Sequence, residues 1–296
     1  MKKSFRLALI SAGLVSAFGL FSPAANAAKI TVALTGQGMS LKCSAGYGAK
    51  TYTCPTIVAA APTNCPTDWV GIPSMKIPTN ASGGTLTVTA FCVQKYVASQ
   101  SGSTAVSSAS GTPWVNVNWN SAQTACTAAG GRLMRDSEWM ALAHNIVNVD
   151  ANWSGGAVDS GNIKDGLQNS EASSAQPSTG TSATGGGRAR TLSTGDVIWD
   201  IGGNVYQWTY GDMTGDSNGL YGSGVYLDRN TAPYDSQTRG MGWNFVPGYT
   251  LPYTGWSGYA PIRGGYWGDG TYAGPFYLYS NTPSSTYSSV GFRCTK

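Results

Sequence analysis

The chain has 296 residues and a formal net charge of +4, and only 11% of its residues are charged. Its first 27 residues hold three cations and no acidic residue, so the remainder carries only +1. That balance argues against a nucleic-acid partner, which needs a strongly basic surface, and the 40 Gly and 16 Tyr favour a globular protein of short strands and long loops.

The N-terminal segment has the pattern of a secretory signal peptide. Three cationic residues precede an apolar run over residues 7–21, and small residues at 25–27 suit signal-peptidase cleavage. The run is shorter than the roughly 20 apolar residues that cross a bilayer, which disfavours a membrane anchor, and no later stretch is long and apolar enough. We expect residues 1–27 to be removed and the mature protein to be periplasmic, cell-surface or secreted.

Two regions follow the signal peptide. Residues 28–62 alternate apolar and polar side chains through Ile30 and Val32, which predicts a small N-terminal β appendage. Residues 63–296 are predicted to form the main domain. Within it, residues 152–190 are dominated by Ser, Gly, Thr, Ala and Asn, which predicts a long surface loop without a packed element.

Two short helices are predicted ahead of that loop. The first covers residues 119–129, where apolar residues share one face, and a Gly-Gly pair ends it. The second carries Asp136 and Glu138 in its first turn, where acidic residues are favourable, and apolar residues from Trp139 onward on one face. His144 lies off that face, so we expect a solvated or capping imidazole rather than a catalytic base.

All six cysteines lie after residue 27. An even number of cysteines in an oxidising compartment predicts three disulfides. Zinc ligation is the rival interpretation, but the chain has no Cys-x-x-Cys pair and a single histidine.

Four separated segments together resemble the formylglycine-generating-enzyme (sulfatase-modifying factor) domain. They are the helix at 119–129, "GGRLMRDSEWMALA" at 130–143, "IWDIGGNVYQW" at 198–208, and "IRGGYW" with "VGFRC" near the end of the chain. The resemblance implies an α+β fold over residues 63–296, the Gly-rich variant of the C-type lectin fold with short strands, two short helices and long loops.

The chain departs from that family where its oxygenase members bind copper. They carry a cysteine pair between "RGG" and "GFRC", whereas residues 263–293 contain no cysteine, so the soft ligands for copper are missing. The related iron-dependent enzymes need several histidines, and this chain has one. Residues 215–219 match the Gly-x-Ser-x-Gly motif of hydrolases, but the strand-turn-helix pattern of a hydrolase does not surround them. We therefore expect no catalytic site, and an oxidoreductase of this family acting on a protein or small-molecule substrate is the alternative.

The same resemblance implies a calcium site in the segment before Trp208. Carried over position by position, its ligands would be Asp200, Gly203, Val205 and Gln207. Gln207 replaces a charged oxygen ligand, which predicts weakened affinity. The alternative is a purely structural strand with tryptophans in the core.

The resemblance also guides the disulfide pairing. In the C-type lectin fold the first helix is commonly tied to the last strand, which implies Cys126 with Cys294. The other expected pairs are Cys65 with Cys92, and Cys43 with Cys54, which flank a Gly-rich turn.

The tyrosine-rich segment, residues 266–289, has the composition of a recognition surface. Its aromatic residues alternate with Ser, Gly, Thr and Asn, and Asp269 is its only charged residue. Tyrosine offers a large contact area at little cost in rotamer entropy, as in antibody paratopes. The alternative is that Gly- and Tyr-rich loops only cover the core.

This segment resembles the variable region of proteins diversified by retroelements, in which adenines of asparagine codons are randomised. Trp267, the "AGPF" run at 273–276, Leu278 and Pro283 match the fixed frame. The variable, ligand-binding places would be Tyr266, Gly268, Asp269, Tyr272, Tyr277, Tyr279, Ser280, Ser285, Tyr287, Ser288 and Ser289.

The sequence therefore predicts an exported, non-enzymatic protein that binds a protein or glycan ligand through a hypervariable surface. The alternatives to this binding protein are the oxidoreductase named above and a structural envelope protein without a selective ligand. The predictions include no nucleic-acid partner and no cofactor other than the implied calcium.

Overall fold

The computed structural model describes residues 31–33, 40–42, 55–78, 85–158, 160–163, 166, 172–179, 187–211 and 258–296. The predicted signal peptide, the Cys43–Cys54 pair and the 215–219 match lie outside these residues.

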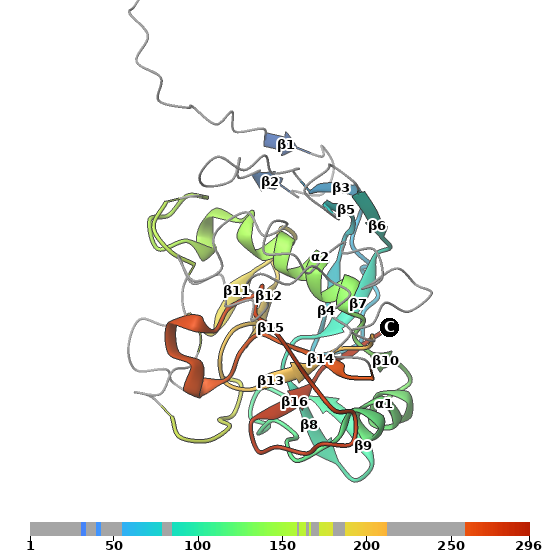
Figure 1. Ribbon diagram of the computed structural model, residues 1–296. Helices are drawn as coiled ribbons and strands as arrows, with labels where there is room; N and C mark the ends of the chain where they lie inside the picture. Colours follow the sequence, from blue (N-terminus) through green and yellow to red (C-terminus); the bar gives the residue numbers. More distant parts are fainter. Residues whose placement is uncertain are drawn as a thin grey trace, which may run out of the picture.

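The fold is α+β, as predicted, and the described residues form short strands and two short α-helices (Figure 1). The helices are α1 (Trp119–Ala128) and α2 (Asp136–Val147), and the 3-10 turns are η1 (Asp150–Asn152) and η3 (Trp267–Tyr272). The early strands are β1 (Thr31–Ala33), β2 (Ser40–Lys42), β3 (Thr56–Ala59), β4 (Trp69–Ile72), β5 (Ser74–Pro78), β6 (Thr85–Val88), β7 (Phe91–Gln94), β8 (Ala98–Ser101) and β9 (Thr104–Ser107). The later strands are β10 (Arg132–Leu133), β11 (Ala189–Thr191), β12 (Val197–Trp199), β13 (Tyr206–Trp208), β14 (Ala260–Arg263), β15 (Leu278–Asn281), β16 (Val290–Phe292) and β17 (Cys294–Thr295).

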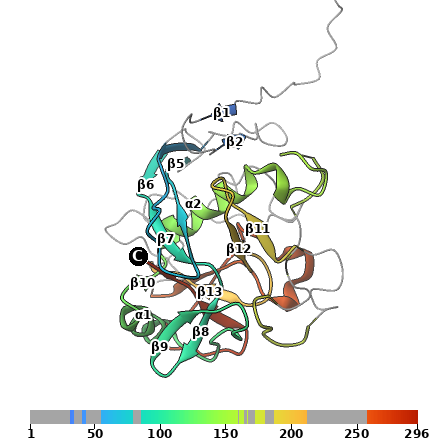
Figure 2. The same ribbon diagram turned by 180° about the vertical axis from the view of Figure 1, so that it is seen from behind.

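The last strands of the chain tie distant parts of the molecule together. β17 lies inside the sheet β10-β17-β7-β4, and β16 closes the sheet β15-β14-β13-β16, where it runs parallel to β13. The chain end therefore lies beside β10 in both views of the molecule (Figures 1 and 2). β3, which falls in the range predicted for the appendage, pairs with β5.

Helix α2 is buried on every side. All its residues are buried, including the polar ones, whereas the periodicity predicted one apolar face. The prediction of a solvated His144 is wrong, because the ring of Phe276 packs edge-on against the imidazole at a centroid distance of 5.1 Å. His144 has no solvent exposure, and this burial lowers its pKa to about 3. The imidazole is therefore neutral at physiological pH.

The core also receives residues from the predicted surface loop. Trp153, Val158 and Ile163 are buried in the same hydrophobic cluster as α2. Trp153 also donates a hydrogen bond from its indole Nε1 to the carbonyl of Val147 at 2.8 Å. A few apolar residues spaced widely in a polar stretch are thus enough to anchor the start of this loop.

Two of the predicted disulfides are confirmed. Cys126 joins α1 to Cys294 in β17, and Cys65 joins the segment before β4 to Cys92 in β7. Disulfides form and persist in oxidising compartments, so the pair indicates an extracellular or periplasmic environment. Among the described residues, no helix has the length and apolar character of a membrane span.

Candidate ligand-binding surface

Glycines of the "IWDIGGNVYQW", "IRGGYW" and "AGPF" motifs meet at one junction next to the tyrosine-rich segment. Gly203 and Gly274 both donate a backbone hydrogen bond to the carbonyl of Gly264, at 3.1 and 3.0 Å. A Cβ atom at Gly202 would stand 3.0 Å from the Cα of Gly274, and Gly264 and Gly265 have φ angles of +87° and +77°. Only glycine allows this close backbone approach and left-handed conformation without strain. The motif glycines therefore position the segment rather than a cofactor.

Buried polar bonds fix α2 to both flanks of this junction. The guanidinium of Arg263 pairs with the carboxylate of Asp136 through bonds of 2.7 and 2.6 Å, and Thr209 donates to the same carboxylate. The indole of Trp139 donates to the carbonyl of Pro275 at 2.7 Å. The "RDSEW" and "IRGG" motifs thus meet in space as a rigid support for η3.

The segment predicted to bind calcium is held by arginines. Arg188 pairs with both carboxylate oxygens of Asp200 at 2.7 and 2.8 Å, and the amide of Asn204 donates to the same carboxylate at 2.9 Å. Asp200 and Asn204 both have positive φ angles, which an Asp or Asn tolerates better than most residues in such a tight loop.

Gln207 is engaged by a second guanidinium. Its amide nitrogen donates to the Asp200 carbonyl at 2.7 Å, and its side-chain oxygen accepts from Nε of Arg293 at 3.0 Å. Burial lowers the pKa of Arg293 to about 9, while Asp200 acts in the opposite direction. The side-chain oxygens of Asp200 and Gln207 are thus already bound by cations or amides, and this arrangement does not fit a calcium ion. Calcium binding stays a prediction of the resemblance alone.

Calcium is expected to leave the melting temperature unchanged within about 1 °C when it is added to chelator-treated protein. An ion stabilises a fold only if it binds the native state, and the side-chain oxygens of Asp200 and Gln207 are already engaged. Differential scanning calorimetry with and without a millimolar excess of calcium checks this. A rise of several degrees would show that the arginine-filled loop rearranges to admit the ion.

The tyrosine-rich segment combines exposed and enclosed residues. Three of its predicted ligand contacts are exposed: Tyr272, Tyr287 and Ser288. Tyr272 has 49% of its area accessible to solvent, and Tyr287 has 43%. Half-buried are Tyr266, Gly268, Asp269, Tyr279, Ser285 and Ser289. Tyr277 and Ser280 are buried, so these two predicted ligand contacts lie beneath the surface. Of the predicted frame, Ala273, Phe276 and Leu278 are buried, whereas Trp267 is half-buried.

Four residues form what we call the acid–tyrosine cluster: Tyr206, Tyr266, Asp269 and Tyr277. The hydroxyl of Tyr206 donates to Oδ1 of Asp269 at 3.0 Å and lies 3.1 Å from the hydroxyl of Tyr277. The rings of Tyr206 and Tyr266 stack at 4.8 Å between centroids. The sequence prediction gave Tyr206 no role, although this residue lies in the "IWDIGGNVYQW" segment, and that segment is the signal that could have found it. Tyr206 is half-buried, between the fully buried Val205 and Gln207.

Burial sets the charge state of this cluster. It raises the pKa of Asp269 to about 6, although the backbone N–H of Tyr266 and the hydroxyl of Tyr206 work against that rise. Burial also raises the pKa values of Tyr206 and Tyr277, so both phenols remain protonated donors. At neutral pH, Asp269 is therefore a carboxylate among neutral phenols.

The second half of the segment is held against the start of α1. Asn116 donates its backbone N–H to the carbonyl of Tyr287 at 2.9 Å, and Trp119 donates to that of Pro283 at 3.1 Å. The side chain of Tyr287 reaches Oδ1 of Asn281 at 3.4 Å. These bonds fix the backbone while the ring of Tyr287 remains exposed.

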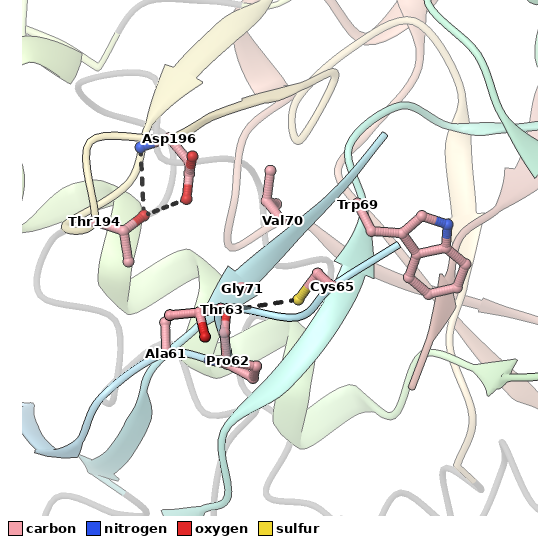
Figure 3. Close-up of a pocket in the computed structure, with 9 residues that line it drawn as sticks. All are labelled: Ala61, Pro62, Thr63, Cys65, Trp69, Val70, Gly71, Thr194 and Asp196. Carbon is pink, nitrogen blue, oxygen red and sulfur yellow. Dashed lines mark hydrogen bonds between the residues drawn. The ribbon is translucent and has the colours of Figure 1, made fainter. Parts of the chain in front are cut away.

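A separate hollow lies away from this surface. A cavity of about 420 Å³ is lined by residues of the segment before β4, by β4 itself and by the β11–β12 turn (Figure 3). Its one charged residue, Asp196, accepts a hydrogen bond from Thr194 at 2.9 Å. Across the described ranges, no three His, Cys, Asp or Glu residues are grouped as metal ligands.

No protein-family model and no curated protein matches the chain. Among solved structures, the chain is similar to variable protein 1 of Treponema denticola, with 15% identity, a TM-score of 0.44, and coverage of 81% of this chain and 99% of that one. It is similar to PvdO from Pseudomonas aeruginosa, with 15% identity, a TM-score of 0.43, and coverage of 80% and 97%. It is also similar to the U1 variant of the Major Tropism Determinant, with 17% identity and a TM-score of 0.36 over 87% of this chain and 62% of that one.

Proposed function

We propose that the chain is an exported binding protein that presents its tyrosine-rich segment to a protein or glycan ligand. The observation that carries this proposal is the exposure of Tyr272 and Tyr287 in a segment whose backbone is hydrogen-bonded to neighbouring elements. Tyrosines on a rigid support lose little entropy on binding and supply a large contact area. The segment therefore has the properties of a preorganised recognition surface.

The division between buried and exposed residues supports diversification by a retroelement. Ala273, Phe276 and Leu278, which match the fixed frame, are buried, and most residues at the variable places have solvent access. Changes at accessible places alter ligand contacts with little effect on the core. Sequencing the neighbouring DNA tests this part, and a reverse-transcriptase gene with an imperfect repeat of the segment is expected there.

Non-enzymatic binding is favoured by the state of the one histidine. His144 is enclosed, and its pKa of about 3 makes it a poor general base at physiological pH. The disulfides Cys65–Cys92 and Cys126–Cys294, together with the signal-peptide pattern, support export. The proposal therefore assigns the segment a binding role outside the cytoplasm.

Changing Tyr272 and Tyr287 together to serine is expected to weaken ligand binding at least about tenfold and to cost no more than about 0.5 kcal/mol of stability for each exposed residue. A random peptide library on phage and a glycan array, applied to the mature protein, provide the ligands. Affinities are then measured by calorimetry and stability by urea unfolding.

The matched control is Tyr210→Ser, which trims a tyrosine of 38% exposure outside the segment. It should leave affinity unchanged. If the double variant binds every selected ligand as well as the wild type, the segment is not the recognition surface.

A further inference from the structure

Asp269 is hydrogen-bonded to uncharged groups, whereas the buried carboxylates outside the tyrosine-rich segment are paired with arginines. Within the described residues, Asp136, Glu138 and Asp200 are buried, and each forms an ion pair with an arginine. Asp269 is half-buried, and no described cation lies within ion-pair distance of it. Among the described residues, the buried carboxylates are thus paired with arginines, whereas the carboxylate in the tyrosine-rich segment has no cationic partner.

The oxygens of Asp269 are oriented by two donors. Oδ1 accepts the hydroxyl of Tyr206 at 3.0 Å, and Oδ2 accepts the backbone N–H of Tyr266 at 3.1 Å. A carboxylate oxygen has two acceptor sites, so each retains capacity for a further donor. Partial removal from water makes an added cation more favourable than it would be at a fully solvated carboxylate.

The residue whose backbone N–H binds Asp269, Tyr266, belongs to a group of contacting aromatic rings. Tyr266 stacks on Tyr206 and meets the ring of Trp267 edge-on at a centroid distance of 5.1 Å. Tyr266 and Trp267 are both half-buried, so each residue keeps some solvent access. Aromatic faces attract ammonium and guanidinium groups, and Trp does so best. A carboxylate and two aromatic rings together form a site for an organic cation.

We propose that Asp269, Tyr266 and Trp267 form a subsite for a lysine or arginine side chain of a protein ligand. This inference rests on the proposed binding function and narrows its partner to a protein. The common functional groups of glycans are hydroxyls, acetamides and carboxylates, which do not provide the cation that Asp269 lacks. Lysine and arginine provide both the charge and an apolar stem that packs against a ring.

Asp269 also has a local structural role that must be separated from binding. It lies at the third position of η3, and its bond to the N–H of Tyr266 closes a capping box. Asn is close in shape to Asp, carries no charge and keeps one acceptor oxygen for this bond. Its amide nitrogen replaces the oxygen that accepts from Tyr206 and can donate to that hydroxyl, which still has the hydroxyl of Tyr277 as an acceptor. Asp269→Asn therefore removes the cation site with little change in the cap.

The test uses the mature wild-type protein and a phage library of random peptides of about twelve residues. We expect the selected peptides to be enriched in Lys and Arg, and Asp269→Asn to weaken their binding at least about tenfold. Thermal melts at neutral pH should show Asp269→Asn at least as stable as the wild type, because a half-buried charge has been removed. Asp196→Asn, which neutralises an exposed carboxylate outside the segment, is the matched control and should leave affinity unchanged.

The outcomes separate this inference from the proposed function. Peptides or glycans that need Tyr272 and Tyr287 but bind Asp269→Asn as tightly as the wild type would overturn the cation subsite and leave the function standing. The absence of any ligand that depends on the tyrosine-rich segment would overturn both. A loss of both stability and binding in Asp269→Asn, without enrichment of Lys or Arg, would assign Asp269 to the cap alone.

Discussion

Replacing Asp200 with alanine is expected to lower the free energy of unfolding by about 3 to 5 kcal/mol, the usual result of removing one partner of a buried ion pair. The side chains of Arg188 and Asp200 are 2% and 0% exposed, and two bonds of 2.7 and 2.8 Å join them. The variant removes the carboxylate while the guanidinium remains out of water. Loss of the bond to Asn204 adds to the cost.

Urea unfolding of the wild type and Asp200→Ala gives the difference directly. Asp196→Ala, which trims an exposed carboxylate, should change the free energy by less than about 0.5 kcal/mol. The double variant Asp200→Leu with Arg188→Met should recover a large part of the loss, because apolar side chains of similar size no longer leave a buried charge. A loss below about 1 kcal/mol in Asp200→Ala would show that water reaches this pair.

The ion pair between Arg188 and Asp200 also explains why the motif at 198–208 did not by itself determine whether the loop binds a metal. Asp200 and Gln207 stand where the resemblance implies metal ligands, but their partners Arg188 and Arg293 come from separate parts of the chain. A local motif names the oxygens and says nothing of the cations that approach them. The tertiary contacts decide which positive charge fills the site.

Local sequence patterns predicted the two helices well, because capping residues and apolar periodicity lie within the helix itself or next to it. The first helix was predicted to end one residue beyond its observed end, Ala128, and the acidic first turn of α2 is present. The disulfide between Cys126 and Cys294 was predicted from the fold family, since no local pattern relates two positions so far apart. Distant contacts of this kind require knowledge of the fold.

Burial was predicted poorly where one element is covered by another far along the chain. Periodicity assigned His144 to solvent, and the ring of Phe276 covers it. In β15, Leu278 and Ser280 are buried while Tyr279 and Asn281 are half-buried, which is the alternation of a strand. The pattern of fixed and variable residues carries no such alternation, so it placed Ser280 at the ligand surface.

His144 is expected to make the protein sensitive to acid. Its pKa is about 3 in the folded protein, whereas a solvent-exposed histidine has a pKa of 6.5. Between these two pH values the unfolded chain therefore binds a proton that the folded protein does not. The stabilisation from the neutral imidazole is therefore complete above pH 6.5 and is lost as the pH falls. Each pH unit well inside this window removes up to about 1.4 kcal/mol from the free energy of unfolding.

Asp269 acts in the opposite direction in part of this range. Its pKa is raised from 3.8 to about 6, so the folded protein holds a proton more tightly, and folding gains stability as the pH falls toward 4. The wild-type profile therefore contains two opposing slopes. Asp269 is partly accessible to water, which screens its contribution, so His144 should have the larger effect.

The variant His144→Gln separates the two contributions. Glutamine does not titrate, so the free energy of unfolding of the wild type minus that of the variant should fall by several kcal/mol between about pH 6.5 and pH 3.5. Asp269 and the other carboxylates are common to both proteins, and their contributions cancel in this difference. Urea unfolding at pH intervals of about one unit measures it. A difference that stays constant across the window would mean that the folded protein protonates His144 as readily as the unfolded chain, which requires water to reach the imidazole beneath Phe276.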